Sequence, residues 1–408
     1  MVDGDINEGI IIPGQENEIL EEEKKRVAQL VKDFQEKRIE DGSNNGKVTF
    51  NPISLKQYQK TYGIVGNHSG VQICHWNKKS VKGHRGCYKV KFYGIDCHKC
   101  AQMSPALAWC TEACVFCWRP SDWMKKTTFG EQEVDDPELI INETVKARKK
   151  LISGLGGAAG VNKLKFKRAF EDFPSHWAIS LSGEPTIYPR LGEMIKILTS
   201  RNDVRSVFVV TNGQEPEHLQ RLADQNALPT QLYVSLTAAN EEMFKKINRS
   251  IYSDGWQRLN RTLEIMAQFD CRRVIRFTLI KNVNDAESLL PAYAELMEKS
   301  KADFLEIKSY MALGFSRKRL GVDNMCGHEE VKKFSERLAM LLPNYRVIDD
   351  DWESRIVLLK RKDSKYMNII KRPSEEARKL AVSNGQSAVG HERNGNVCSC
   401  NGANKCTQ

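Results

Sequence analysis

WAISLSGEP, at residues 177–185, is the first of five short apolar runs that decide the fold. The other four are VFVVTNG from Val207, LYVSLTA from Leu232, VIRFTLI from Val274 and FLEIKSY from Phe304. Runs of this length, rich in β-branched and aromatic residues, are typical of buried strands. Helical patterns lie between them: LGEMIKILTS from Leu191, PEHLQRLADQ from Pro216 and LNRTLEIMAQ from Leu259. Strands and helices that alternate at this spacing predict βα units around a parallel sheet or barrel.

Polar side chains mark the ends of three of these strands. Ser182, Thr211 and Ser235 stand where the first three runs finish. Because α/β folds place their chemistry at the carboxyl ends of parallel strands, we expect these residues at the site. A further helix over 331–342 and a strand over 356–359 extend the pattern.

The chain outside the βα units divides into distinct segments. Residues 1–46 form a polar leader with one helical pattern between Glu18 and Arg38, and 47–100 are basic and rich in cysteine. We expect the catalytic core at 101–362 and an extension at 363–408. From residue 383 the extension is rich in Gly, Asn and Ser, which is typical of disorder. Its cysteines 398, 400 and 406 form a CxC and then a gap, which could recruit metal, but a segment with nothing to bury favours a bystander role.

Composition and charge narrow the class of protein. The 408 residues are 40% hydrophobic and 28% charged, as in soluble globular proteins. No apolar run reaches about 18 residues and the start MVDGDINEGI lacks a signal peptide, so a cytoplasmic protein is expected. The net charge is +10, with −6 in residues 1–46 and therefore +16 in the rest. Residues 47–100 contain ten Lys or Arg and one acid, Asp96, which favours a polyanion such as RNA as partner.

The segment CTEACVFC carries the strongest chemical signal. Cys110, Cys114 and Cys117 follow a CxxxCxxC spacing. Three thiolates on one loop can bind three irons of a [4Fe–4S] cluster and leave the fourth open. A structural zinc site is the alternative, although zinc usually requires a closed set of four ligands.

This loop, followed by βα units, resembles that of the radical S-adenosylmethionine (SAM) superfamily. The resemblance implies a (β/α)6 partial barrel in which SAM binds the open iron and is cleaved to a 5′-deoxyadenosyl radical. Phe116 matches the aromatic position of the superfamily motif, and Ser182, Gly183 and Glu184 match its glycine-rich element near the SAM amino group. With them, the SAM contacts expected are Thr211, Asn212 and Ser235.

A narrower resemblance covers most of the chain from about residue 62 to 362. GIDCHKCAQMSPALAWCTEACVFCWRP, SLSGEPT, TNG, SLTA and KSYMALGFSR are similar, in this order, to motifs of the tRNA 4-demethylwyosine synthase family. Because the polar leader is too short for a flavin-binding domain, we expect the chain to lack the flavodoxin domain of eukaryotic members, as archaeal members do. The resemblance implies that a carbon–carbon lyase-type enzyme condenses pyruvate with N1-methylguanosine at position 37 of tRNA(Phe). It also implies an external electron donor, and we expect a monomer.

The family resemblance gives roles to four further residues. Cys74, Cys87 and Cys100 match the ligands of a second [4Fe–4S] cluster, with the role of Cys97 left open. Lys89 matches the lysine proposed to form a Schiff base with pyruvate. Crowding by the cations Arg85, Lys91 and Lys99, or partial desolvation, would lower its pKa and favour this chemistry. A phosphate contact is the alternative role for Lys89.

Other basic residues are expected to contact RNA phosphates. We select Lys163, Lys165 and Arg168, in KLKFKR, as RNA contacts. Within the superfamily, the alternative function is another RNA-modifying enzyme such as a methylthiotransferase, which would donate sulfur and need no pyruvate. The alternative from another class is an RNA-binding protein with structural zinc.

Overall fold

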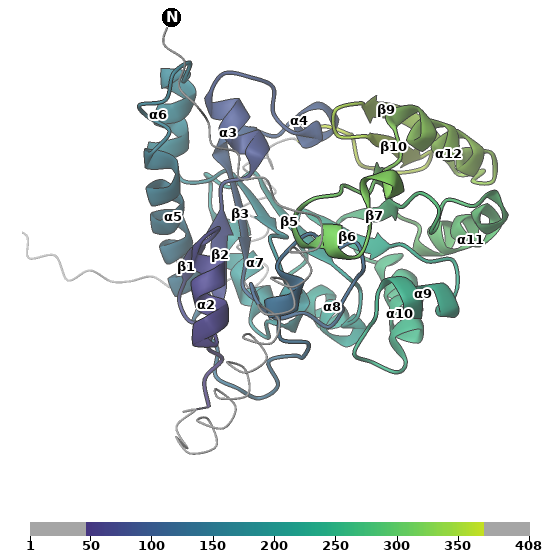
Figure 1. The fold of residues 1–408 in the computed structure, drawn as a ribbon, viewed down its shortest axis with the longest axis horizontal. Coiled ribbons are helices and arrows are strands. Elements are labelled where there is room, and N and C mark those ends of the chain that lie inside the picture. The colour runs from purple at the N-terminus through teal and green to yellow at the C-terminus, as the bar shows by residue number, and fades with distance from the viewer. Residues whose placement is uncertain (1–45, 371–408) are drawn as a thin grey trace, which may run out of the picture. The chain divides into compact units, whose positions relative to one another are not determined.

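The computed structural model describes residues 46–370 and shows a single ten-stranded sheet (Figure 1). Its centre is six parallel strands: β3 (Cys100–Ser104), β4 (His176–Ile179), β5 (Ser206–Thr211), β6 (Gln231–Leu236), β7 (Arg272–Leu279) and β8 (Phe304–Ser309). The helix expected in the leader and the tail with cysteines 398, 400 and 406 lie outside the described residues.

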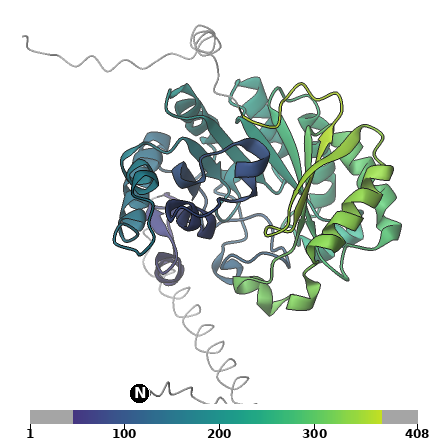
Figure 2. The same ribbon diagram turned by 90° about the horizontal axis from the view of Figure 1, so that it is seen from above.

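Antiparallel strands extend both ends of the parallel block. β2 (Ser69–Gln72) pairs with β3 and β1 (Gly63–Val65) pairs with β2, whereas β10 (Ile356–Arg361) pairs with β8 and β9 (Tyr345–Asp351) with β10. The two ends do not pair with each other, so the curved sheet stays open between them (Figure 2). The structure thus confirms the predicted partial barrel.

Helices cover the outer face of this sheet. They are α5 (Pro137–Ser153), α7 (Leu191–Ser200), α8 (Pro216–Asp224), α9 (Glu241–Ile247), α10 (Gly255–Met266), α11 (Leu290–Ser300) and α12 (His328–Met340). Every second strand residue, such as Val207, Val209 and Phe277, packs with these helices in the main hydrophobic core. No helix among residues 46–370 is long and apolar enough to cross a membrane.

The inner face of the sheet has its own apolar cluster. Phe208, Tyr233 and Phe304 pack there with residues of α4 (Tyr88–Tyr93). Ile370 closes the same cluster, and its backbone N–H donates to the carbonyl of Tyr93. The first residues of the C-terminal extension are therefore part of the core.

Short elements before β3 complete the described chain. α2 (Pro52–Gln59) precedes β1, and α3 (His75–Val81) and α4 lie between β2 and β3. α6 (Lys163–Glu171) follows α5 and lies beside α3 (Figure 1).

Candidate active site

Three cysteines lie on the loop that follows β3, and we name Cys110, Cys114 and Cys117 the loop set. Backbone hydrogen bonds hold this loop, with Ala113 N donating to Asn248 O at 3.1 Å and Val115 N to Ile247 O at 2.9 Å. Arg319 adds two side-chain bonds, from Nε to Val115 O at 3.1 Å and from Nη2 to Cys117 O at 2.6 Å. These hydrogen bonds fix the backbone of the loop and so the positions of its three cysteines.

The loop set is buried and electrostatically coupled. Burial raises the pKa of Cys114 well above its usual value, and Glu112, Cys110 and Cys117 raise it further. Glu112 Oε2 accepts from the Cys114 thiol at 3.0 Å, and burial raises the pKa of Glu112 to about 8. The other oxygen, Oε1, is buried without a partner among the described residues.

The strand-end residues predicted to contact SAM gather beside this loop. Gly183 has φ +70°, and a Cβ atom there would lie 1.8 Å from Ala106 O, so only glycine fits. The Ser182 hydroxyl is buried and has no hydrogen-bond partner among residues 46–370. Ser235 is half-buried on the inner face, and Phe116 packs against an apolar cluster that includes Tyr310.

The Glu184 carboxylate organises two strand ends. Its Oε1 accepts from the Thr186 hydroxyl at 2.6 Å and from the Thr211 hydroxyl at 2.7 Å, and Oε2 accepts from Asn212 N at 2.8 Å. Asn212 Nδ2 in turn donates to the Thr111 hydroxyl at 2.9 Å, on the cysteine loop. Glu184 thus ties β4, β5 and the loop set together, a positioning role that the sequence pattern did not indicate.

The second group of thiols comes from three separate elements, and we name Cys74, Cys87 and Cys100 the dispersed set. Cys74 precedes α3 and its Sγ accepts from Asn77 N at 3.4 Å, Cys87 precedes α4, and Cys100 begins β3. Burial, together with the nearby thiols of Cys74 and Cys87, raises the pKa of Cys100 to about 12. The folded chain therefore brings these three thiols together.

Cys97 lies against the dispersed set. The proximity of the Cys97 and Cys87 thiols lowers the pKa of Cys87 and raises that of Cys97. Cys97 is itself buried, at the start of a short 3-10 helix. Cys97 therefore supports Cys87 directly, whereas Cys271 and Cys326 are buried elsewhere in the main core.

Lys89 extends from α4 onto the inner face of the sheet. Its Nζ lies 4.6 Å from the ring centre of Phe208 and 4.4 Å from that of Tyr233. Burial lowers the pKa of Lys89, Glu306 opposes this and Arg276 adds to it. The structure agrees with the predicted desolvation of this amine.

The three cations predicted to crowd Lys89 are not those that lower its pKa, because each of them pairs with an acidic residue. Arg85 pairs with Asp351, Lys91 Nζ lies 2.7 Å from Asp349 Oδ1, and Lys99 Nζ lies 2.8 Å from Asp172 Oδ2. The cation that acts on Lys89 is Arg276, from β7, which the sequence analysis did not consider.

A buried polar network surrounds Lys89. The Tyr88 and Tyr93 hydroxyls donate to Glu306 at 2.9 and 2.7 Å, and Arg276 Nη1 donates to the Tyr88 hydroxyl at 2.7 Å. Lys308 is two residues beyond Glu306, and burial lowers its pKa to about 7. Charged residues inside the apolar runs VIRFTLI and FLEIKSY were the signal that could have identified this network.

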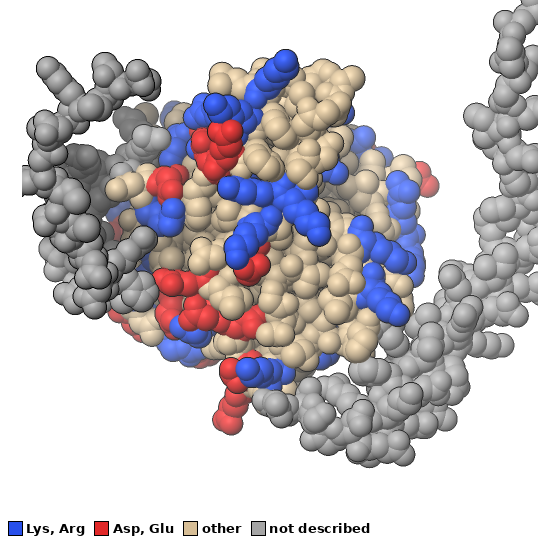
Figure 3. All heavy atoms as spheres, turned by 90° about the vertical axis from the view of Figure 1, so that its left-hand side faces the viewer, with Lys and Arg blue, Asp and Glu red and all other residues tan. Residues whose placement is uncertain are grey.

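The residues selected for RNA contact lie on α6, away from both thiol sets in the sequence. Lys163 and Arg168 are exposed and Lys165 is half-buried. Arg168 Nε lies 3.8 Å from Asp172 Oδ2. Lys and Arg gather on the upper part of this face and acidic residues below (Figure 3). The basic area is therefore local rather than uniform.

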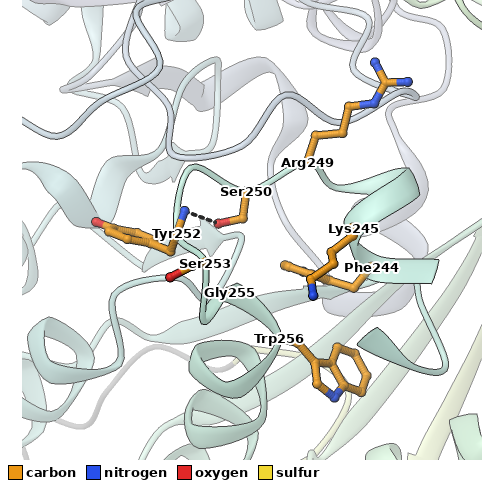
Figure 4. Close-up of a pocket in the computed structure, with 8 residues that line it drawn as sticks. All are labelled: Phe244, Lys245, Arg249, Ser250, Tyr252, Ser253, Gly255 and Trp256. Carbon is orange, nitrogen blue, oxygen red and sulfur yellow. Dashed lines mark hydrogen bonds between the residues drawn. The ribbon is translucent and has the colours of Figure 1, made fainter. Parts of the chain in front are cut away.

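A cavity of about 230 Å³ lies between α9 and the start of α10. It is lined by Phe244, Lys245, Arg249, Ser250, Tyr252, Ser253, Gly255 and Trp256 (Figure 4). None of the predicted site residues lines it. Two of its lining residues, Arg249 and Ser250, belong to the segment 247–251, which holds the loop set by backbone hydrogen bonds.

The donor atoms of the two thiol sets determine which metal group each set could hold. Within residues 46–370, no three His, Cys, Asp or Glu side chains are arranged to hold a single metal ion. Each set nevertheless offers three thiols within electrostatic range of one another. The Ser182 hydroxyl and Glu112 Oε1 are buried and have no hydrogen-bond partner among residues 46–370. These groups fit an iron–sulfur cluster with a polar ligand next to it.

Two family models match the chain. The model of the Radical SAM superfamily matches residues 105–289, and that of Wyosine base formation matches residues 299–361. The first match covers β4 to β7 and the loop set, and the second covers β8 to β10.

Individual proteins are also similar to the chain. The S-adenosyl-L-methionine-dependent tRNA 4-demethylwyosine synthase of Pyrococcus abyssi is 46% identical over 74% of this chain and 86% of its own length. The human relative of the same name is 35% identical over 79% of this chain and 42% of its own length. A solved structure described as TYW1 with a lysine-pyruvate adduct bound has TM-score 0.68 and 34% identity, covering 79% of this chain and 99% of that chain.

Proposed function

We propose a specific reaction for this chain, which belongs to the tRNA 4-demethylwyosine synthase family of radical SAM enzymes. The family acts in the wyosine pathway of tRNA modification, and membership implies SAM and a [4Fe–4S] cluster. Our proposal is that the chain condenses pyruvate with N1-methylguanosine at position 37 of tRNA(Phe) in the cytoplasm. The pyruvate carboxyl carbon leaves, so the reaction is of carbon–carbon lyase type, and an external donor supplies the electron. The chain would act as a monomer.

The loop set would hold the radical SAM cluster in this proposal. A bound cluster and SAM would supply the 5′-deoxyadenosyl radical that abstracts hydrogen from the N-methyl group. The chain's own part is to orient SAM, for which Ser182, Thr211, Asn212 and Ser235 stand at the strand ends. Glu184 keeps two of these ends fixed through its hydrogen bonds. Gly183 allows the backbone beside them to approach the loop, and Phe116 anchors the loop by packing.

The dispersed set would hold a second [4Fe–4S] cluster. Two observations support this assignment: the three thiols come together from three elements, and the surrounding inner face is apolar and aromatic. Cys97 would act as a hydrogen-bond partner of Cys87 rather than as a ligand.

Lys89 would bind pyruvate as an imine, and its buried amine carries the proposal. An amine must lose its proton to attack a carbonyl, and burial between Phe208 and Tyr233 lowers the pKa of Lys89. The imine would hold the donor carbons in place, so that the nucleoside radical adds to a neighbour that is already positioned. One similar solved protein is described as carrying a lysine-pyruvate adduct.

The proposal is tested with the anaerobically purified full chain. SAM, a reductant, pyruvate and a tRNA carrying N1-methylguanosine are combined, and the nucleosides are analysed for the tricyclic product. Borohydride added during turnover with labelled pyruvate should leave label on the peptide that contains Lys89. Lys89→Arg keeps the charge but should form neither the imine nor the product. Near-normal product from this variant would contradict the imine role and favour the alternative, in which Lys89 contacts a phosphate.

Positive residues of α6 would contact the tRNA backbone. Charge reversal at Lys163, Lys165 and Arg168 should weaken tRNA binding and make its salt dependence shallower by about 0.7 to 0.9 per lost phosphate contact. Reversal at Lys245 and Lys246 of α9 and Arg261 of α10, which pair with Glu241, Glu242 and Glu264, is the charge-matched comparison. Equal effects of the two reversals would contradict a specific role for α6.

A further inference from the structure

Three arginines are buried in the described part of the chain, and one of them differs from the others. Arg148 donates from Nε, Nη1 and Nη2 to the carbonyls of Cys100, Ala169 and His98. Arg272 likewise uses all three nitrogens, on Gln231, Met367 and Asn368. Arg119, which is 6% exposed, uses only Nη1, which donates to Gln72 Oε1 at 2.9 Å and the Tyr62 hydroxyl at 3.3 Å.

The remaining donors of Arg119 have no partner among residues 46–370. Nε and Nη2 donate to no described residue, and no carboxylate there pairs with the guanidinium. Neither nitrogen is among the fully buried donors that lack a partner in residues 46–370, so both reach the surface of the described structure. These two donors are therefore open to a partner from outside the folded chain.

The guanidinium is held in a fixed plane. Its Cζ lies 3.7 Å from the ring centre of Trp118 and 5.8 Å from that of Tyr62. Stacking and the two Nη1 bonds leave the edge formed by Nε and Nη2 available. These two N–H groups are parallel and match two oxygens of one oxyanion.

The location of Arg119 is beside both thiol sets. It follows Cys117 of the loop set by two residues, and its charge also reaches Cys74 of the dispersed set. Gln72, its acceptor, ends β2, which is the second strand from one edge of the sheet. A substrate that approaches the site from this side would meet Arg119.

We propose that Arg119 binds a phosphate of the tRNA substrate through Nε and Nη2, with Trp118 as a stacking surface for an adjacent base. Trp118 is 44% exposed, so one side of its ring can receive a base while Arg119 occupies the other. This inference rests on the proposed function only in taking a tRNA as the substrate. The proposed phosphate site at Arg119 would position the anticodon loop of the tRNA beside the two thiol sets.

Other oxyanions are less suited to this position. The proposed keto-acid site is at Lys89, whose neighbours Phe208, Tyr233, Glu306 and Arg276 include none of the contacts of Arg119. The exposed aromatic ring beside the free edge matches a nucleotide, which combines a base with a phosphate, better than a small carboxylate.

The first test measures tRNA binding as a function of salt, with a methylated tRNA transcript as probe. Arg119→Gln should weaken binding about ten- to a hundredfold, as expected for loss of a charged hydrogen-bonded pair. The slope of log K against log salt should become shallower by about 0.7, the value for one phosphate on a single strand. Arg261→Gln, at an exposed arginine of α10, is the matched control and should change neither quantity.

The second test locates the phosphate. Anticodon stem-loops with a single methylphosphonate at each position in turn are bound to the wild-type chain and to Arg119→Gln. One position should weaken wild-type binding by a similar factor but change binding by the variant less than about twofold. Equal losses in both proteins at every position would overturn the proposal, as would a raised KM for pyruvate or SAM with unchanged tRNA affinity.

Folding and function are kept separate in this design. Arg119→Lys keeps the charge without the paired donors, so it should lose affinity at the same position even if Arg119→Gln is unstable. Wild-type protein that binds tRNA but makes no tricyclic product contradicts the proposed function alone. Normal product formation together with unchanged tRNA binding by both variants contradicts the Arg119 site alone.

Discussion

The two thiol sets differ in how the chain holds them. The loop set lies within eight consecutive residues, 110–117, and its frame is mostly backbone, from residues 247–251. The dispersed set spans residues 74–100, and side chains hold it: Asn77 Nδ2 donates to the carbonyls of Cys97 and Cys100, and Arg148 to those of His98 and Cys100.

The loop set is therefore positioned mainly by local backbone structure, whereas the dispersed set is positioned by tertiary contacts of side chains. A contiguous loop with backbone partners tolerates many side-chain changes, because backbone bonds do not depend on residue type. A site supported by buried side chains depends on each of them, since losing one leaves several polar groups unpaired. We therefore expect the dispersed set to fail first under mutation, acid or salt.

The largest expected effect separates the sets completely. Replacing Cys110, Cys114 and Cys117 together by alanine should abolish SAM cleavage and product, while about half of the iron and sulfide remains. Iron and sulfide analysis of the anaerobic protein measures this. Complete loss of iron in the triple variant would contradict two independent clusters.

The reciprocal change uses a single residue of the dispersed set. Cys74→Ala should abolish the tricyclic product but retain some SAM cleavage that is not coupled to it, because the loop set keeps its own frame. Product and 5′-deoxyadenosine are quantified in the same reaction. If SAM cleavage disappears together with product, the two sets depend on each other.

The next effect concerns Arg148, which supports the dispersed set. Arg148→Met keeps the packing volume but removes the donor from the buried carbonyls of Ala169 and His98, at about 1–3 kcal/mol each, while Asn77 still donates to that of Cys100. Unfolding free energy should fall by about 3 kcal/mol or more and iron should fall toward half. Arg319→Met is the matched change at the loop set, where two carbonyls lose a donor. Equal iron loss from both variants would refute the difference in support.

These two sites also show what the sequence could predict. The strands from Trp177 to Phe304 and the helices between them follow from local periodicity, and the structure confirms them. The loop set could be recognised from the sequence because its three cysteines lie within one short CxxxCxxC motif. The dispersed set came only from family resemblance, since helix ends and β3 bring its members together.

Partners across the fold were beyond the sequence analysis. Glu306 and Arg276 come from β8 and β7 and meet Tyr88 of α4 only after the sheet has formed. The pairing of Arg85 with Asp351 joins residues 266 positions apart. No pattern in a single sequence indicates which acid a given base will meet at such a separation.

A smaller effect is expected from acid, through His176. His176 Nε2 accepts from Asp96 N at 3.0 Å and so holds the turn before Cys100. Burial lowers the pKa of His176 from 6.5 to about 3, so its contribution is complete above pH 6.5 and is lost as the pH falls toward 3. About 1–2 kcal/mol should be lost by pH 5.

Hydrogen exchange measures this loss, after correction for the intrinsic rate. Amides of residues 96–100 should lose protection between pH 6.5 and 5, whereas those of the loop set keep theirs. In His176→Gln, which does not titrate, the protection of residues 96–100 should vary less with pH. Equal loss of protection at both sets would assign acid sensitivity to the whole fold.

The smallest effect is expected from the hairpin of β9 and β10, whose Asp351 pairs with Arg85 near the dispersed set. Asp351 at the end of β9 is buried and pairs with Arg85, which is 37% exposed and lies two residues before Cys87. Asp351→Asn keeps the shape but removes the charge, which for a partly exposed pair costs about 0.5–1 kcal/mol. Product formation should fall about twofold at low salt and less at high salt, because screening already weakens the pair.

Asp203→Asn gives the comparison for this last change. Asp203 Oδ2 lies 2.8 Å from Arg201 Nη2 in an exposed pair after α7, with no contact to either thiol set among the described residues. Its loss should leave product formation unchanged at every salt concentration. If Asp351→Asn behaves in the same way, the hairpin does not support the dispersed set, and Arg148 and Asn77 hold that set without it.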